Sequence, residues 1–97
     1  MSPEKQRIAI ATACGWEELP EGHYHPDNPI GQTIPDYLND LNACHEAEKV
    51  LTGGMRSKYD AELTLICSRD YNFIWESTAP QRAEAFLRTL GLWEDAQ

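Results

Sequence analysis

The residues best suited to hold a metal ion lie in one segment, His23-Tyr24-His25 followed by Asp27. Two imidazoles and a carboxylate can ligate zinc or another transition metal. Residues two apart point the same way only in an extended segment, which the prolines around them favour. No cysteine lies near them at the spacing that zinc sites usually add. His23, His25 and Asp27 are therefore weak metal candidates; we favour a polar surface loop and expect no cofactor.

A further acid–base pair, His45 and Glu48, lies three residues apart on a predicted helix, so that both side chains share one face. The two could act as an acid/base pair or as half of a metal site, but a solvent-facing hydrogen bond or salt bridge is the interpretation we favour. Asn39, Asp40 and Asn42 crowd the start of the same helix. These residue types favour capping; the alternative is that they line a ligand cleft and bind a base or ribose edge.

Several large aromatic residues outside the last predicted helix could stack on nucleobases, namely Trp16, Tyr37, Tyr71, Phe73 and Trp75. Aromatic side chains also fill small cores, and we expect most of these to do so. Tyr71 lies at a predicted turn and is the best candidate for exposure. Trp16 and Tyr71, together with Tyr24 and His25 of the long loop, are predicted ligand-binding residues.

Three arginines are candidate anion contacts, namely Arg69, Arg82 and Arg88. Arg82 lies in the first turns of the last predicted helix, beside a helix N-terminus that favours phosphate. Arg88 lies near the other end of that helix, where a cation is expected for structural reasons. Arg69 and Arg82 therefore complete the predicted ligand-binding set.

The sequence contains no recognisable catalytic motif: no G-x-S-x-G, P-loop, G-x-G-x-x-G or H-E-x-x-H is present. We therefore predict that the chain is not an enzyme. Its three cysteines, Cys14, Cys44 and Cys67, are an odd number and form no CxxC pair. They sit among apolar or small neighbours, which predicts reduced core residues in a reducing compartment.

The chain has 97 residues and a formal net charge of -8, with no basic stripe. This length predicts one domain, residues 1–97. The charge disfavours direct binding to nucleic acid or to an anionic membrane. No apolar run approaches the ~20 residues of a transmembrane helix, and the first residues lack a signal-peptide core. We therefore expect a cytoplasmic protein.

Three helices are predicted from capping residues and periodicity. The first covers about residues 3–14, because Ser2 and Pro3 start a helix well and Gly15 supplies a left-handed stop. Residues 16–33 are rich in Pro and Gly and predict an irregular segment with at most a short strand. The second helix starts at Pro35, carries an apolar stripe and ends at 53–54.

The alternation of Leu63, Leu65 and Cys67 predicts a strand over 62–68, which pairs with an aromatic strand over 73–76 as an antiparallel hairpin. The last helix starts at a capping box of Thr78 and Gln81 and ends at Gly91, where Leu92 would contact Leu87. The predicted fold class is α+β: a small antiparallel sheet, with a third short strand as an option, packed by about three helices in a layered α/β/α sandwich.

Three stretches together resemble small phage and prophage proteins of the phage ABA sandwich domain family. They are residues 13–16 (ACGW), 35–49 (PDYLNDLNACHEAEK) and 79–91 (APQRAEAFLRTLG). The resemblance covers residues 8–93 and is least evident in 17–34. It implies a layered fold with helices on both faces of a small sheet, and a phage or prophage origin. It implies no catalytic residues.

From these observations we expect a non-catalytic phage accessory protein in the host cytoplasm, acting in immune evasion by sequestering a small anionic, nucleotide-like signalling ligand. A homo-oligomer would help, because pockets often form at interfaces. One alternative is an acidic inhibitor that binds a host defence protein, steered by charge to a basic partner or mimicking nucleic acid. Another is a small metal-dependent hydrolase.

Overall fold

The computed structural model describes residues 1–19, 22–24 and 34–95. In this part of the chain the elements follow one another as α1 (Pro3–Ala13), β1 (Glu17–Leu19), β2 (Gly22–Tyr24), α2 (Leu41–Glu48), α3 (Gly54–Arg69), the short 3-10 helix η1 (Ile74–Glu76) and α4 (Ala79–Thr89). The described residues are thus mostly helical, and the predicted α+β class is wrong.

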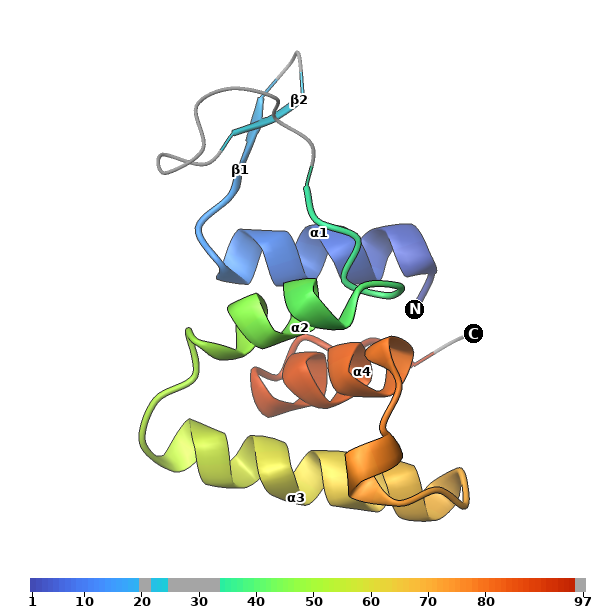
Figure 1. The fold of residues 1–97 in the computed structure, drawn as a ribbon. Coiled ribbons are helices and arrows are strands. Elements are labelled where there is room, and N and C mark those ends of the chain that lie inside the picture. Colours follow the sequence, from blue (N-terminus) through green and yellow to red (C-terminus); the bar gives the residue numbers. More distant parts are fainter. Residues whose placement is uncertain (20–21, 25–33, 96–97) are drawn as a thin grey trace.

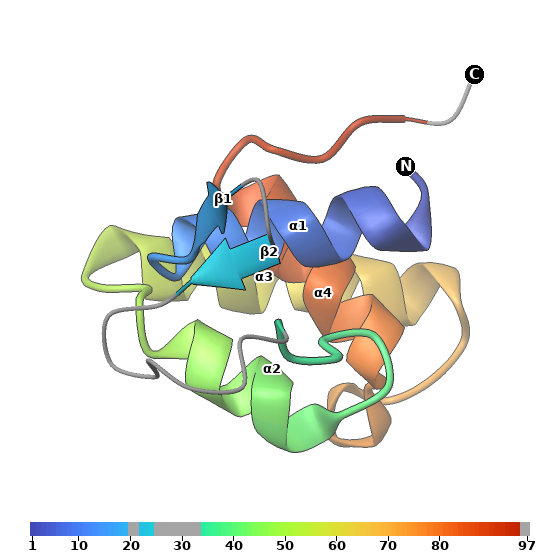
Figure 2. The same cartoon turned by 90° about the horizontal axis from the view of Figure 1, so that it is seen from above.

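Helix α4 lies at the centre of the fold and packs against each of α1, α2 and α3. In Figure 1 it runs between α1 on one side and α3 on the other, with α2 alongside, and Figure 2 shows the same arrangement from above. Its central place explains why it buries residues on every side, including Ala83, Ala85, Phe86 and Leu87. A helix that is buried all round needs neighbours on all faces, and the other three helices supply them.

The buried core joins residues from all four helices and from the segments around α1 and α2. Trp16 is buried at the end of α1, and Ile34 and Tyr37 are buried in the segment before α2. The remaining members of the core cluster are Ile10, Ala11, Ala43, Ala47, Leu51, Tyr59, Leu63, Ile66, Cys67, Ala83, Ala85, Phe86 and Leu87.

The predicted first helix is confirmed to within one residue. The Ser2 hydroxyl accepts a hydrogen bond from the Lys5 amide at 3.2 Å, and Pro3 occupies the first helical turn. Gly15 has a φ of 98°, which is the left-handed region that glycine enters at little cost. Helix α1 therefore begins and ends where Ser2, Pro3 and Gly15 predict.

The predicted signals of the last helix are also confirmed. The Thr78 hydroxyl accepts from the Gln81 amide at 3.3 Å, while the Gln81 side chain accepts from the Thr78 amide at 2.9 Å, which completes the capping box. At the other end Gly91 has a φ of 72°, and the Leu92 amide donates to the Leu87 carbonyl at 2.8 Å. This is the Schellman ending expected from the glycine.

The second predicted helix is shorter than expected and begins later. Asp40 has an extended backbone, and its carboxylate accepts from the Asn42 amide at 2.9 Å and the Ala43 amide at 3.4 Å. Capping by Asp40 is therefore confirmed, and it starts the helix at Leu41. Residues 37–39 before it form a turn, in which the Asn39 side chain donates to the Asp36 carboxylate.

The predicted hairpin is wrong, because residues 62–68 belong to the sixteen-residue helix α3 and residues 74–76 form η1. The buried side chains of α3 are Tyr59, Leu63, Ile66 and Cys67. They recur at helical spacing, while Leu65, which the alternation placed beside Leu63, is 66% exposed. A window of seven residues is too short to separate the two periods, and Tyr59 lies just outside it.

The layered α/β/α sandwich is likewise contradicted. The strands in the described residues are β1 and β2, three residues each, which pair antiparallel with Glu17 opposite Tyr24. A pair this short, between α1 and α2, forms no layer that helices could cover on both faces. Residues 1–19, 22–24 and 34–95 thus lack the layered sheet that the phage ABA sandwich resemblance implies.

The prediction of core positions is confirmed for Cys44 and Cys67, which are buried, while Cys14 is half-buried at the margin of the core. Within the described ranges, none of the helices is both long and apolar enough to cross a membrane.

Candidate functional site

A buried carboxylate, Glu48 at the end of α2, connects three helices. Its Oε1 accepts hydrogen bonds from the Tyr59 hydroxyl of α3 and from the Arg82 guanidinium of α4, the latter at 2.8 Å. Its Oε2 lies 3.3 Å from Nδ1 of His45, whose side chain is exposed. The predicted contact between His45 and Glu48 is therefore present, but only His45 faces solvent, because Glu48 is buried.

Hydrogen bonds and the charge of Arg82 keep the Glu48 carboxylate ionised. Burial by itself would raise the pKa of Glu48, but the hydrogen bonds from Tyr59 and Arg82 outweigh it and hold the pKa below its usual value. Burial and the Glu48 carboxylate raise the pKa of Tyr59, so the phenol keeps its proton. Cys44 nearby has its pKa raised to about 11, chiefly by burial, and is not a thiolate nucleophile at neutral pH.

The cluster has little space for a ligand. The cavity beside Glu48, Tyr59 and Arg82 has a volume of about 10 Å³, roughly one water molecule. Both oxygens of Glu48 already have partners. We therefore interpret this cluster as a structural connection between helices, in which Arg82 neutralises Glu48 and is not available as a free anion contact.

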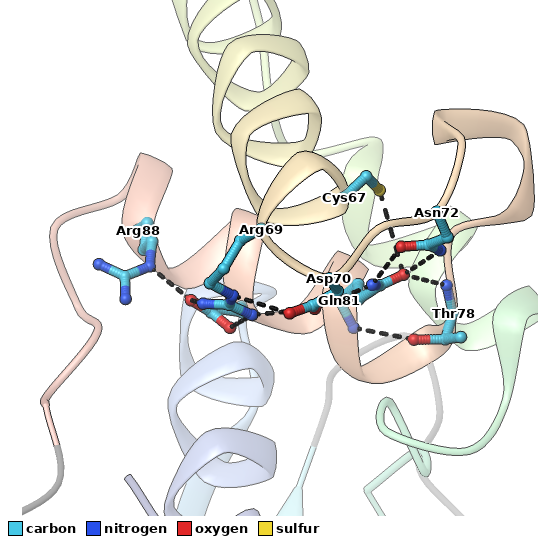
Figure 3. Close-up of polar contacts among 8 residues, drawn as sticks. Cys67, Arg69, Asp70, Asn72, Thr78, Gln81 and Arg88 are labelled. Atoms are coloured by element: carbon cyan, nitrogen blue, oxygen red, sulfur yellow. Dashed lines mark hydrogen bonds and ion pairs between the residues drawn. The ribbon is translucent and has the colours of Figure 1, made fainter.

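The second polar cluster joins the end of α3 to α4 through Glu84, which is buried. The Arg69 guanidinium donates to Glu84 at 2.9 Å and to Asp70 at 2.9 Å, and Arg88 donates to the same Glu84 at 2.7 Å (Figure 3). Arg69 and Arg88 also line a groove of about 220 Å³ between the two helices, together with Glu62, Leu65 and Ile66. Two of the three predicted anion contacts thus share one groove, with their charge already compensated by acids.

The third feature is a hydrogen-bonded clamp between the α3–η1 connection and α4. Asn72 and Gln81 exchange side-chain hydrogen bonds, and Gln81 also donates to Asp70 at 3.0 Å. Figure 3 shows Gln81 reaching from α4 to both residues. The hydrogen bonds from Arg69 and then Gln81 lower the pKa of Asp70 to about 2, so this carboxylate is ionised at neutral pH. The clamp fixes the path of the chain that leaves α3.

That path begins with an unusual residue. Helix α3 ends as α4 does, with the Asn72 amide donating to the Cys67 carbonyl at 3.0 Å and the Tyr71 amide donating to Ser68 at 3.3 Å. The position that Gly91 occupies after α4 is held here by Tyr71, with a φ of 60°. A non-glycine residue in this region costs roughly 1–2 kcal/mol. The fold therefore accepts strain to place a tyrosine here.

The connection from Tyr71 to Trp75, which we call the aromatic connector, presents its large side chains to solvent. Tyr71 is 96% exposed, Phe73 61% and Trp75 75%. The Phe73 and Trp75 rings stack, with centroids 4.6 Å apart and an interplanar angle of 4°. The expected exposure of Tyr71 is confirmed. The expectation that most of the five aromatics are buried is wrong, because Phe73 and Trp75 are exposed as well.

The predicted ligand-binding residues do not form one site in the described residues. Arg69 and Tyr71 flank the start of the aromatic connector, whereas Arg82 lies in the Glu48 cluster and Trp16 is in the core. His25 and Asp27 lie outside the described residues, and for His23 and Tyr24 only the backbone, in β2, is described. In the part of the chain that is described, no group of three His, Cys, Asp or Glu side chains could hold a metal ion.

Sequence reasoning missed the clamp of Asn72 with Gln81 and the exposure of Phe73 and Trp75. Residues 71–75, YNFIW, combine three aromatics in five positions and are separated by two residues from the capping box of α4. A short apolar run of this kind is also compatible with a buried strand, so its exposure was decided by the tertiary structure.

The fold and its polar clusters define a small protein whose described part is built from helices around α4. The chain matches no family model, no curated protein and no solved structure. The resemblance to phage proteins therefore stays a prediction.

Proposed function

We propose that this chain is a protein-binding module and that the aromatic connector, residues 71–75, is its contact surface. The observation that carries this proposal is the solvent exposure of Tyr71, Phe73 and Trp75 on one short, clamped connection. Large aromatic side chains bury roughly 150–250 Å² each when they are covered. Leaving three of them in water is unfavourable unless a partner covers them, and such patches mark interaction sites.

The composition of the connector suits a protein partner. Trp and Tyr are enriched among the few interface residues that carry most of the binding energy. The Phe73 and Trp75 rings present a flat stacked surface beside Ile74, which is 37% exposed. A partner could cover this surface without displacing anything from the core.

The connector is also held rigid before binding. The clamp of Asn72 with Gln81 ties it to α4, and the Glu76 carboxylate accepts from the Phe73 amide at 3.4 Å. A surface that is ordered in advance loses less conformational entropy on association. The strained backbone of Tyr71 supports the same conclusion, because glycine would satisfy the helix ending at lower cost.

The charge of the chain indicates the kind of partner. A net charge of -8 steers association toward a basic surface and suppresses binding to acidic ones. A host defence protein as that partner, and a phage origin, are the expectations carried from the sequence resemblance.

Site-specific photo-crosslinking tests the proposal. Trp75 is replaced by the photo-reactive p-benzoylphenylalanine in a chain expressed in bacteria, and irradiated cells are examined for covalent adducts by mass spectrometry. The control places the same group at Leu65, which is 66% exposed on α3. We expect a discrete protein adduct from position 75 and none from position 65. Equal labelling from both positions, or none from position 75, would contradict a specific surface.

A second proposal keeps the sequestration of a small anionic ligand, because Arg69 and Arg88 line one groove. It has weaker support, since Glu84 and Asp70 already compensate both arginines. Native mass spectrometry of the purified protein checks it: a nucleotide-sized adduct that disappears in Arg88→Ala supports sequestration, and a chain of 11.0 kDa without an adduct contradicts it.

A further inference from the structure

A shallow groove lies next to the aromatic connector, between the turn before α2 and the start of α4. Its volume is about 550 Å³, and its walls are formed by Leu38, Asn39, Leu41, Glu76, Ser77, Thr78, Ala79 and Pro80. Glu76 and Ser77, in the lining of this groove, directly follow Trp75 in the chain. In Figure 1 the start of α4 and the turn before α2 lie next to each other.

The groove has an apolar wall that is partly open to solvent. Leu41 is 45% exposed, and Leu38 is half-buried against the core. Pro80 is exposed on the opposite side and has no amide hydrogen to be satisfied. An aliphatic side chain of a partner would find apolar contacts on both walls.

The groove also contains an unpaired hydroxyl. Ser77 is only 6% exposed, and its Oγ has no hydrogen-bond partner in the part of the chain that is described. A buried hydroxyl without a partner costs free energy, roughly 1–3 kcal/mol. The Ser77 Oγ is itself closed to solvent, so the polar contact that the groove offers a ligand comes from Glu76 and not from this hydroxyl.

The charges around the groove favour a cation. Glu76 is the only ionisable residue in the described lining. Asp36 and Asp40 lie at the same end, where Asp36 accepts from Asn39 and Asp40 caps α2. The N-termini of α2 and α4 would attract an anion. However, the Asp40 carboxylate and the Thr78 hydroxyl already accept hydrogen bonds from the backbone amides at these helix starts.

We propose that this groove binds a short basic segment of the partner protein. An aliphatic side chain of that segment packs against Leu41 and Pro80, and a neighbouring Lys or Arg lies beside the Glu76 carboxylate. This inference rests on the proposed function, because it gives the chemistry of the partner that covers the aromatic connector.

The probes are two blocked peptides, one of alternating Arg and Leu and one with Glu in place of each Arg. Binding is followed by the backbone amide shifts of the ¹⁵N-labelled full chain. We expect the basic peptide to shift the amides of Leu41, Ser77 and Ala79, and the acidic peptide to leave them unchanged. Shifts of equal size with both peptides, or none with the basic one, would overturn the proposal.

Two variants with the same change in charge separate the groove from general electrostatics. Glu76→Lys should weaken binding of the basic peptide at least tenfold, while Asp60→Lys, on the exposed side of α3, should weaken it less than twofold. Leu41→Ser, which leaves the charge unchanged, should also weaken it. Equal effects of Glu76→Lys and Asp60→Lys would show attraction to net charge alone and would overturn the groove.

The two proposals fail in different ways. A crosslinked adduct from position 75 without peptide binding in the groove overturns only the proposal that the groove binds a basic segment. Peptide binding in the groove without an adduct from position 75 overturns the aromatic connector as the contact surface and leaves the groove standing.

Discussion

Asn72 and Gln81 exchange two side-chain hydrogen bonds: the Asn72 amide donates to the Gln81 oxygen at 2.9 Å, and the Gln81 amide donates back at 2.9 Å. The pair joins the chain after α3 to the first turn of α4. The same Gln81 oxygen caps α4 by accepting from Thr78. One side chain therefore sets both the start of the central helix and the position of the aromatic connector.

Asn72→Ala should lower the free energy of unfolding by about 1–2 kcal/mol, because it removes both hydrogen bonds with Gln81 and leaves the Gln81 amide nitrogen with Asp70 as its one acceptor among the described residues. Urea denaturation measures this. Asn39→Ala is the control, since Asn39 is exposed and bonds only to Asp36 among the described contacts, and it should stay within about 0.5 kcal/mol of the parent. Equal stability of the two variants would mean that the clamp contributes nothing.

Glu48→Ala should lower the free energy of unfolding by about 3 kcal/mol, because Arg82 and Tyr59 then lose the carboxylate that satisfies them. Glu46→Ala, in the same helix and with the same change in charge, breaks only an exposed pair with Lys49 and should cost less than about 0.5 kcal/mol. Chemical denaturation of both variants compares them. Similar losses would show that helix α2, and not the Glu48 cluster, is what the substitutions weaken.

Stability should fall in acid partly through Glu84. Burial would raise its pKa, but the hydrogen bonds from Arg69 and Arg88 outweigh burial and hold the pKa below 4.5 in the folded state. A lowered folded pKa stabilises the protein above the unfolded pKa, and this contribution is lost as pH falls toward the folded pKa. Urea denaturation from neutral pH to about pH 3 should therefore give a smaller loss for Glu84→Gln than for the parent. If the free energy of unfolding falls equally with pH in the parent and in Glu84→Gln, Glu84 is excluded as a source of the acid sensitivity.

Gly91→Ala should lower the free energy of unfolding by about 1 kcal/mol, because the φ of 72° is unfavourable for a residue with a Cβ. Gly54→Ala is a matched control: no atom lies within 4 Å of the added Cβ and the residue starts α3, so it should be neutral or slightly stabilising. Thermal and urea unfolding distinguish the two. A neutral Gly91→Ala would refute the left-handed helix ending.

Tyr71→Gly, unlike Gly91→Ala, should raise the free energy of unfolding, by about 0.5 kcal/mol. The reason is that glycine adopts the left-handed backbone at this position without the strain of a side chain. The same substitution removes a side chain that is 96% exposed and contacts no core. It should therefore also reduce the photo-crosslink from position 75. A loss of stability would show that Tyr71 supports the fold rather than the surface.

The sequence by itself determined the ends of two helices. Ser2 with Gly15, and Thr78 with Gly91, bracket α1 and α4 as predicted, because capping and left-handed endings depend on the residues at the ends alone. Capping by Asp40 is local in the same way. The net charge, which favours a basic partner, also needs no tertiary information.

Only the tertiary structure decided the class of residues 54–76. Leu63 and Cys67 are four residues apart, a spacing that places both on one face of either a strand or a helix. The helix forms because α4 packs along the face that also carries Tyr59 and Ile66. The fate of the charged and aromatic residues was decided there too. Arg82 is paired because α2 brings Glu48 beside α4. Trp75 is exposed although the Asn72–Gln81 clamp ties its segment to α4 and η1 contacts α3.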